Sequence, residues 1–331
     1  MSWKIVSFFL FFVYIPFTFC KEVRILSLDG GGIRGVASLE LLKNLEQDTG
    51  VSFHEEFDIF AGTSTGSIIA VTLAMGIPIQ EMMTNYIHLS SKVFGDEKAF
   101  SLFSPKYDQH TLKKNLLKIF ESHGYSKETT LGELPKKVLI PTVCLDDPET
   151  HRWSMKVLEN ITDQGKGIRV IDAVLESTAA PTYFPSYKHS VDGGLAANDP
   201  SLTAYTYAYH PYNIQENGVL LLSIGTGYTE RHIKGEEDWG SGKWISPVSI
   251  SGKHENPPIL SMISDVEGQV PQQLLSVLIP NSYRKINFVL KKPIDLDDYK
   301  DMKELIKEAD AFVISNPGFW QETCSWLKNS L

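Results

Sequence analysis

Two apolar segments near the start of the sequence are each followed by glycines and then by a helical pattern. The first, Val23–Leu28, runs into Asp29-Gly30-Gly31-Gly32, after which apolar residues recur at helical spacing. The second, residues 57–61, breaks at Gly62 and leads into an apolar helix over residues 67–74. A strand, a glycine turn and a helix therefore occur twice in succession. This alternation predicts an α/β fold, in which helices pack on the faces of a parallel sheet.

The rest of the chain continues the alternation without an internal repeat, a low-complexity tract or a linker, which favours a single domain. A long polar stretch at 228–256 contains Trp239 and Trp244 and predicts a functional or disordered loop. These tryptophans could form a flap that touches lipid, although packing under the loop is favoured. The apolar patterns predict helices near 79–92, 108–122, 169–178, 257–279 and 299–315, and strands near 136–144, 151–157, 219–224 and 283–290.

Composition excludes some classes of function. Of the 331 residues, 42% are hydrophobic and 21% are charged, which is ordinary for a globular protein with a substantial core. The formal net charge of −9 argues against nucleic acid as the main partner. An acidic protein can still bind lipid through apolar contacts or a local patch. The three cysteines and nine histidines show no ligand-like spacing, so no metal site is expected.

The first twenty residues have the layout of a secretory signal peptide. Lys4 precedes an apolar run at 5–15 that ends at Pro16, and this run is shorter than the roughly 20 residues that span a bilayer. Residues 17–20 lack the small side chains typical of a cleavage site, which keeps open an uncleaved anchor or a buried N-terminal element. Lipid modification at Cys20 is not expected, because Phe19 is a poor fit before it. We therefore predict a signal over 1–20, export, and one domain over 21–331.

Gly62-Thr63-Ser64-Thr65-Gly66 matches the G-x-S-x-G nucleophile elbow in sequence and in context. The strand-to-helix turn is crowded, so glycine is required two residues on either side of the serine. Such a turn exposes the Ser64 hydroxyl at the carboxyl end of a strand. The free N–H groups and dipole of the next helix face developing negative charge there.

The glycine run Asp29-Gly30-Gly31-Gly32-Ile33-Arg34-Gly35 predicts an oxyanion site, because adjacent glycines leave backbone N–H groups unshielded. Arg34 either steadies this loop or attracts a phosphate, or it is a surface residue at the helix start. The run also satisfies G-x-G-x-x-G, the dinucleotide-binding fingerprint. That alternative requires an acidic residue at the end of the second strand. The second strand ends instead in the Ser64 turn, and Asp48 lies in a polar stretch that closes the helix, so the dinucleotide interpretation is disfavoured.

Taken together, these motifs resemble the patatin-like phospholipases. The resemblance rests on the two glycine motifs above and on three later segments, and it spans roughly residues 22–227, with 228–331 taken as the C-terminal part of the same domain. The later segments are Ser177-Thr178-Ala179-Ala180-Pro181-Thr182-Tyr183-Phe184-Pro185, Asp192-Gly193-Gly194-Leu195-Ala196-Ala197-Asn198-Asp199-Pro200 and Ser223-Ile224-Gly225-Thr226-Gly227.

The resemblance implies a three-layer α/β sandwich with a mainly parallel central sheet, related to the α/β-hydrolases. It also implies a Ser–Asp dyad, with Ser64 as nucleophile, Asp192 as base and Gly193-Gly194 forming the base loop. A free aspartate has a pKa of about 3.9, so partial burial is needed to make Asp192 an effective base. The implied function is a lipid acyl hydrolase that needs no cofactor and acts on phospholipid or glycerolipid at a membrane or micelle surface.

Two alternatives stay open. A Ser–His–Asp esterase would place its histidine after the acid, which makes His210, His232 and His254 the candidates. His189 is close to Asp192 in sequence, but strand geometry would point the two side chains to opposite faces. A secreted lipid-binding or host-interaction protein on the same fold is the non-enzymatic alternative. It has no need of the dyad and both glycine motifs together, which counts against it.

Overall fold

The computed structural model describes residues 22–95, 104–212, 218–230, 240–245 and 258–329. The proposed leader at 1–20 lies outside them, as do Trp239, His232 and His254. Seven strands form one sheet: β1 (Val23–Leu28), β2 (Ile59–Gly62), β3 (Lys137–Cys144), β4 (Ser154–Glu159), β5 (Ser190–Asp192), β6 (Val219–Ile224) and β7 (Tyr283–Ile286). The order is β4-β3-β2-β1-β6-β7. The central pairs from β3 to β7 are parallel, whereas β4 and β5 pair antiparallel with β3.

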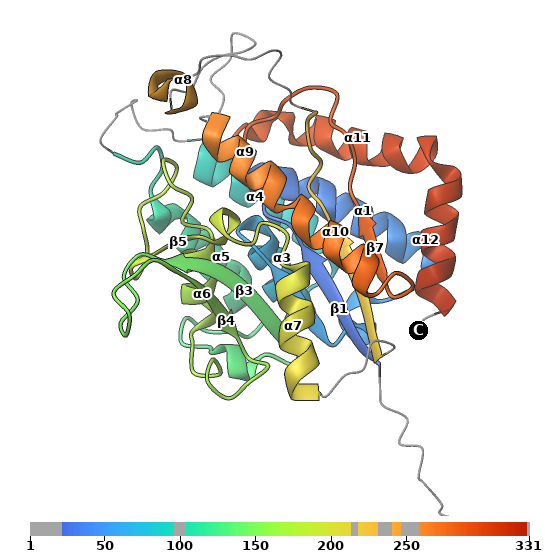
Figure 1. Ribbon diagram of the computed structural model, residues 1–331, viewed down its shortest axis with the longest axis horizontal. Coiled ribbons are helices and arrows are strands. Elements are labelled where there is room, and N and C mark those ends of the chain that lie inside the picture. The colour runs from blue at the N-terminus through green and yellow to red at the C-terminus, as the bar shows by residue number, and fades with distance from the viewer. Residues whose placement is uncertain (1–21, 96–103, 213–217, 231–239, 246–257, 330–331) are drawn as a thin grey trace, which may run out of the picture.

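Helices cover both faces of this sheet, so the predicted three-layer α/β architecture is confirmed (Figure 1). The α-helices are α1 (Gly35–Thr49), α2 (Phe53–Glu56), α3 (Thr65–Ala74), α4 (Ile79–Phe94), α5 (Gln109–Ser122), α6 (Val170–Ser177), α7 (Ser201–Tyr212), α8 (Ser241–Ile245), α9 (Pro258–Glu267), α10 (Gln269–Leu278), α11 (Met302–Ser315) and α12 (Pro317–Asn329). Short 3-10 helices lie at Gly32–Arg34, Leu131–Glu133, Gly193–Leu195 and Tyr299–Asp301.

The alternation of strand side chains divides the core in two. In β1, Leu26 and Leu28 point into the larger core under α1, α3, α4 and α6, whereas Ile25 points into the smaller core under α7 and α10. β6 alternates in the same way, with Leu222 on the first face and Leu221 on the second. Strands that are buried on both faces read as continuous apolar runs, which is why β1 and β6 stand out in the sequence.

Most predicted elements are confirmed, and the main differences lie after residue 227. The helix predicted over 257–279 is divided at Gly268 into α9 and α10. The strand predicted over 283–290 ends at Ile286, because Asn287 and the residues after it bond to the turn that follows β6. Within the polar stretch 228–256 the structure describes one short helix, α8. α12 was not predicted. Among the described residues, no helix is both long and apolar enough to cross a membrane.

Candidate active site

Ser64 lies in the tight turn between β2 and α3, as the sequence predicts. Its φ of 53° and ψ of −121° place it outside the usual regions for a residue with a side chain. A Cβ on Gly62 would overlap the backbone of Gly66, and a Cβ on Gly66 would overlap the carbonyl of Leu28. Both glycines are therefore needed for the turn to pass this close to neighbouring backbone.

Asp192 lies beside Ser64 because β2 and β5 pair with successive parts of the same edge of β3. The pairing of β2 with β3 ends at Leu139, and β5 pairs from Thr142 onward, while β4 occupies the other edge. Asp192 is opposite Thr142, just beyond the point where the chain leaves β2. The Ser64 hydroxyl donates a 2.6 Å hydrogen bond to Asp192 Oδ2.

The environment of Asp192 makes its carboxylate more basic than a free one. The side chain is buried, and its other oxygen accepts a 2.7 Å hydrogen bond from the Gly194 N–H. Burial raises the pKa of Asp192 to about 6, and the hydrogen bonds from Ser64 and Gly194 oppose part of that rise. The sequence argument required this partial burial.

Ser177, at the end of α6, holds the Ser64 turn and was not singled out from the sequence. Its hydroxyl accepts the Ser64 N–H at 2.9 Å and donates to the carbonyl of Pro141 at 2.7 Å. The Ser64 N–H is therefore occupied within the protein. Ser177 begins one of the segments on which the family resemblance rests, and that position was the available signal.

The glycine loop lies against the Ser64 turn. A Cβ on Gly30 would come within 3.4 Å of the Ser64 Cβ, and the Gly30 N–H donates to the carbonyl of Asn198 at 3.0 Å. Within the described part of the chain, no acceptor takes the N–H groups of Gly31 and Gly32. Gly32 has a φ of 56°, in the region that favours glycine. These two N–H groups are the ones in this loop able to bind an oxyanion.

The other predicted loop residues take different positions. Arg34 lines the cavity described below, and its Nε donates to the carbonyl of Gly31 at 3.4 Å, in line with a steadying role. Gly194 also lines the cavity. Gly35 and Gly193 do not. A Cβ on Gly35 would crowd Thr65, and a Cβ on Gly193 would overlap the carbonyl of Pro141, so these two glycines allow close packing behind the site.

A buried ion cluster ties the glycine loop to the helix after the base loop. Lys285 Nζ lies 2.6 Å from the Asp29 carboxylate, 2.7 Å from Asp199 Oδ2 and 3.0 Å from Ser223 Oγ. Burial raises the pKa of Asp29 well above its usual value, and the Asp199 carboxylate raises it further. Burial alone would lower the pKa of Lys285, but the two carboxylates outweigh burial and raise it. Lys285 therefore remains a cation.

Like Ser177 and Lys285, Glu267 at the end of α9 was not singled out from the sequence. Its carboxylate accepts the backbone N–H of Asn198, whose side chain lies against Gly30 and Gly194. Burial raises the pKa of Glu267 to about 7, the Asn198 hydrogen bond lowers it, and the Asp199 carboxylate raises it again. Asp199 accepts the Ser201 N–H at 2.9 Å and so caps α7.

Ser64, Asp192, the glycine loop and Lys285 all line one cavity of about 1760 Å³. No described histidine is among its lining residues, and His189 is exposed at the surface. The backbone of His210 lies in α7, but its side chain is outside the described atoms, so the histidine alternatives are not tested. In the described residues, no group of three histidine, cysteine, aspartate or glutamate side chains could hold a metal ion.

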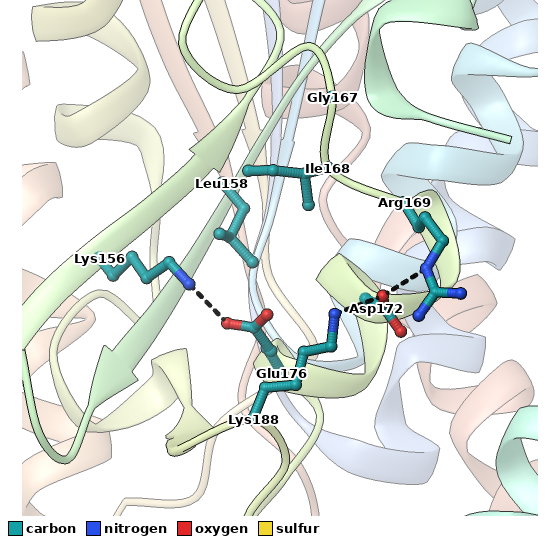
Figure 2. Close-up of a pocket in the computed structure, with 8 residues that line it drawn as sticks. All are labelled: Lys156, Leu158, Gly167, Ile168, Arg169, Asp172, Glu176 and Lys188. Carbon is teal, nitrogen blue, oxygen red and sulfur yellow. Dashed lines mark hydrogen bonds and ion pairs between the residues drawn. The ribbon is translucent and has the colours of Figure 1, made fainter. Parts of the chain in front are cut away.

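A second cavity, of about 410 Å³, lies against β4 and α6 (Figure 2). Lys156 points to Glu176 at 3.0 Å, while Lys188 and Arg169 converge on Asp172 at 2.6 and 2.7 Å. Both carboxylates are buried at the foot of this charged bowl, which we define by these five residues. Because Glu176 precedes Ser177 and also accepts the Ser190 hydroxyl at 2.9 Å, the bowl braces α6 and β5 behind the Ser64–Asp192 pair.

The fold and the site define an α/β protein with an elbow serine hydrogen-bonded to a buried carboxylate. The chain belongs to the patatin-like phospholipase family, whose model matches residues 26–205. It is 28% identical to patatin-like protein 4 of Arabidopsis thaliana, over 89% of this chain and 81% of that protein. It is 31% identical to a cGAMP-activated phospholipase of Vibrio cholerae, over 70% of this chain and 69% of that protein.

Among solved structures, the chain matches the heterodimeric ExoU–SpcU complex of Pseudomonas aeruginosa. The match covers 94% of this chain and 52% of that chain, with a TM-score of 0.41 and 14% identity. A second is VipD of Legionella pneumophila, at a TM-score of 0.38 and 13% identity, over 87% of this chain and 67% of that chain. The relatives named as phospholipases support a lipid hydrolase.

Proposed function

We propose that the protein is a phospholipase A-type lipid acyl hydrolase, which cleaves fatty acyl esters of phospholipids or other glycerolipids. The observation that carries this proposal is the 2.6 Å hydrogen bond from Ser64 to the buried Asp192, beside the glycine loop. The cavity of about 1760 Å³ above them exceeds the size usual for small-molecule sites and leaves room for an acyl chain. Export through residues 1–20 and transient association with a membrane complete the proposal.

In the first half of the reaction, the Asp192 carboxylate takes the proton of the Ser64 hydroxyl, and Oγ attacks the ester carbonyl carbon. Negative charge moves to the carbonyl oxygen, where the N–H groups of Gly31 and Gly32 stabilise it. When the tetrahedral intermediate collapses, the bond to the leaving alcohol breaks and Asp192 returns its proton to that oxygen. The lysolipid leaves, and the acyl group stays on Ser64.

In the second half, Asp192 accepts a proton from water while the water oxygen attacks the acyl carbonyl. The bond to Ser64 Oγ then breaks, and Asp192 gives its proton back to the serine. Fatty acid is released and the starting state is restored. The proposed reaction uses the side chains and backbone of the protein and water alone.

The nucleophile is tested by Ser64→Ala on mixed-chain phospholipid vesicles. We expect fatty acid release to fall roughly thousand-fold or more, as when the nucleophile of a serine hydrolase is removed. Ser276→Ala is the matched control, because Ser276 lines the same cavity and its hydroxyl donates to Gln273 instead of to a carboxylate. Equal release from the wild type and Ser64→Ala would remove Ser64 from the reaction. A wild type that binds vesicles without releasing fatty acid would favour the lipid-binding alternative.

The base is tested by the pH dependence of kcat/KM. Since Asp192 must be ionised to accept the proton and burial raises its pKa to about 6, kcat/KM should fall as pH drops through that value and level off above it. Asp192→Asn should be inactive over the whole range. If Asp192→Asn stayed active while a substitution of His210, His232 or His254 abolished activity, the base would be a histidine.

A further inference from the structure

The outer faces of α9 and α10 carry a concentration of exposed apolar side chains. Among the described residues, this short segment holds eight of the large apolar side chains that are exposed to solvent. They are Ile259, Met262, Ile263, Val266, Val270, Leu274, Val277 and Leu278. A contiguous apolar surface of this kind on a folded protein marks an interaction site. We refer to these eight residues as the α9–α10 stripe.

The α9–α10 stripe follows helical spacing across the junction of the two helices. Val266, Val270, Leu274 and Leu278 are each four residues apart, so their side chains lie along one face. Gly268, between the helices, keeps helical dihedrals with φ −65° and ψ −15°, and α10 continues the line of α9 (Figure 1). On the opposite face, Leu275 is buried in the smaller core against α7.

The stripe reaches the edge of the cavity that contains Ser64. Met262 and Val266 belong to the stripe and also line that cavity. Further along α10, the cavity wall is polar and includes Gln269, Gln272 and Ser276. An acyl chain could therefore pass from the stripe into the cavity at Met262 and Val266, next to Asp265, which lines the cavity as well.

The charges of the two helices indicate which surface they fit. Residues 258–278 contain two acidic side chains, Asp265 and Glu267, and no lysine or arginine. Glu267 is turned inward, where it accepts the Asn198 N–H. Attraction to anionic lipid requires clustered basic residues, whereas insertion of apolar side chains does not.

We propose that the α9–α10 stripe docks on a zwitterionic phospholipid surface and sets the mouth of the Ser64 cavity against the lipid. This inference rests on the proposed lipid substrate. Insertion is driven by apolar burial, so binding should be insensitive to salt and should gain nothing from anionic lipid.

The test is a triple variant, Val270→Gln, Leu274→Gln and Val277→Gln. None of the three residues lines the cavity, and glutamine retains helix propensity. Binding to phosphatidylcholine vesicles, measured by co-sedimentation, should fall roughly tenfold or more, as should hydrolysis of those vesicles. Hydrolysis of a dissolved short-chain ester should stay unchanged, which also reports that the variant is folded. Met155→Gln is the control, because it makes a similar change at a similarly exposed apolar residue away from the stripe. Met155 is 42% exposed and Leu274 is 46% exposed. Met155 lies on β4, at the end of the sheet opposite to β7, which α10 contacts.

The outcomes separate this inference from the proposed function. Ser64→Ala should bind vesicles as the wild type does while releasing no fatty acid. If the wild type released no fatty acid from any substrate but the triple variant lost vesicle binding, the hydrolase would fail and the docking surface would stand. Unchanged vesicle binding by the triple variant would overturn the docking surface. A shift of the triple variant from dimer to monomer in light scattering without lipid would overturn it too, and would assign the stripe to a second copy of the chain.

Discussion

The wall of the large cavity and the charged bowl beside α6 both bury carboxylates, but they supply positive charge very differently. In the bowl, three cations form ion pairs with two carboxylates. Of the two carboxylates, Asp172 accepts three hydrogen bonds, from Lys188, Arg169 and Tyr187. In the wall, Asp29 and Asp199 share Lys285, while Asp192 accepts hydrogen bonds from two neutral groups.

The pKa values follow this difference. Burial alone would raise the pKa of Asp172, but its three donors outweigh burial and lower it. Burial raises the pKa of Asp192 to about 6 and that of Glu267 to about 7. The pKa of Asp29 stays raised although Lys285 contacts it, because burial and the Asp199 carboxylate outweigh this one shared cation. Asp172, which two cations contact, is therefore a brace, whereas Asp192, whose donors are neutral, keeps its affinity for a proton. Only the second kind suits the base that we propose for the reaction.

The largest effect is expected from Lys285→Met. The change leaves Asp29 and Asp199 buried without their shared cation, and breaking such a buried pair costs about 3–5 kcal/mol. Urea unfolding at pH 7 measures this free energy. A loss below about 1 kcal/mol would show that the cluster does not depend on its cation.

The next effect has the opposite sign. Asp192 has a pKa of about 6 in the fold and an ordinary value of about 3.8 in the unfolded chain, so the folded protein holds this proton to higher pH. The protonated Asp192 side chain makes its full contribution to the free energy of unfolding below the ordinary pKa, and this contribution is lost as pH rises through about 6. Asp192→Asn should therefore raise the free energy of unfolding by up to about 3 kcal/mol at pH 8 and by little at pH 4.

Fatty acid release by Asp192→Asn is measured beside its urea unfolding. Fatty acid release should disappear while stability rises, since the ionised carboxylate is costly to the fold and necessary to the reaction. A variant that is less stable than the wild type at pH 8 would contradict the raised pKa of Asp192.

The sequence predicted the contacts between residues close together in the chain better than those between distant residues. The Ser64 turn is local, and its two glycines predicted its geometry. Asp192 is 128 residues away from Ser64 and was identified only through the family resemblance. Lys285 lies 256 residues from Asp29, and nothing local connects them.

A weaker signal for the Lys285 cluster did exist. Ser27 interrupts the apolar run of β1 that follows Arg24, and Ser223 interrupts the apolar run of β6; Ser27 pairs in register with Ser223, and Ser223 with Lys285. A polar residue in a strand that is buried on both faces requires a partner. These three polar residues, side by side in the sheet, could have indicated a buried polar cluster. They could not have indicated which carboxylates complete it, because no local pattern in the sequence shows that β7 pairs with β6.

A third, smaller effect is expected from Asp172→Asn in the bowl. The pKa of Asp172 is lowered in the fold, so the stability it contributes is present above its ordinary pKa and is lost as pH falls through the folded value. The variant should lose about 1–2 kcal/mol at pH 7, as for a buried group with fewer satisfied donors. Asp172→Asn should be less stable than the wild type at neutral pH, and this loss of unfolding free energy should become smaller in acid. Asp192→Asn should be more stable than the wild type at high pH, and this gain should also become smaller in acid. Matching signs for the two variants would break the comparison.

The smallest effect is expected from Lys188→Met, which makes the same chemical change as Lys285→Met in the other region. The Lys188 side chain is 50% exposed and that of Lys285 is 4% exposed. Arg169 and Tyr187 stay on Asp172, so the carboxylate keeps two donors. An ion pair with a solvent-exposed partner contributes about 1 kcal/mol or less, and the loss should diminish in high salt. If Lys188→Met cost as much as Lys285→Met, the number of donors and the exposure of the cation would not be what separates the two regions. The position of each cluster relative to the sheet would then have to explain the difference.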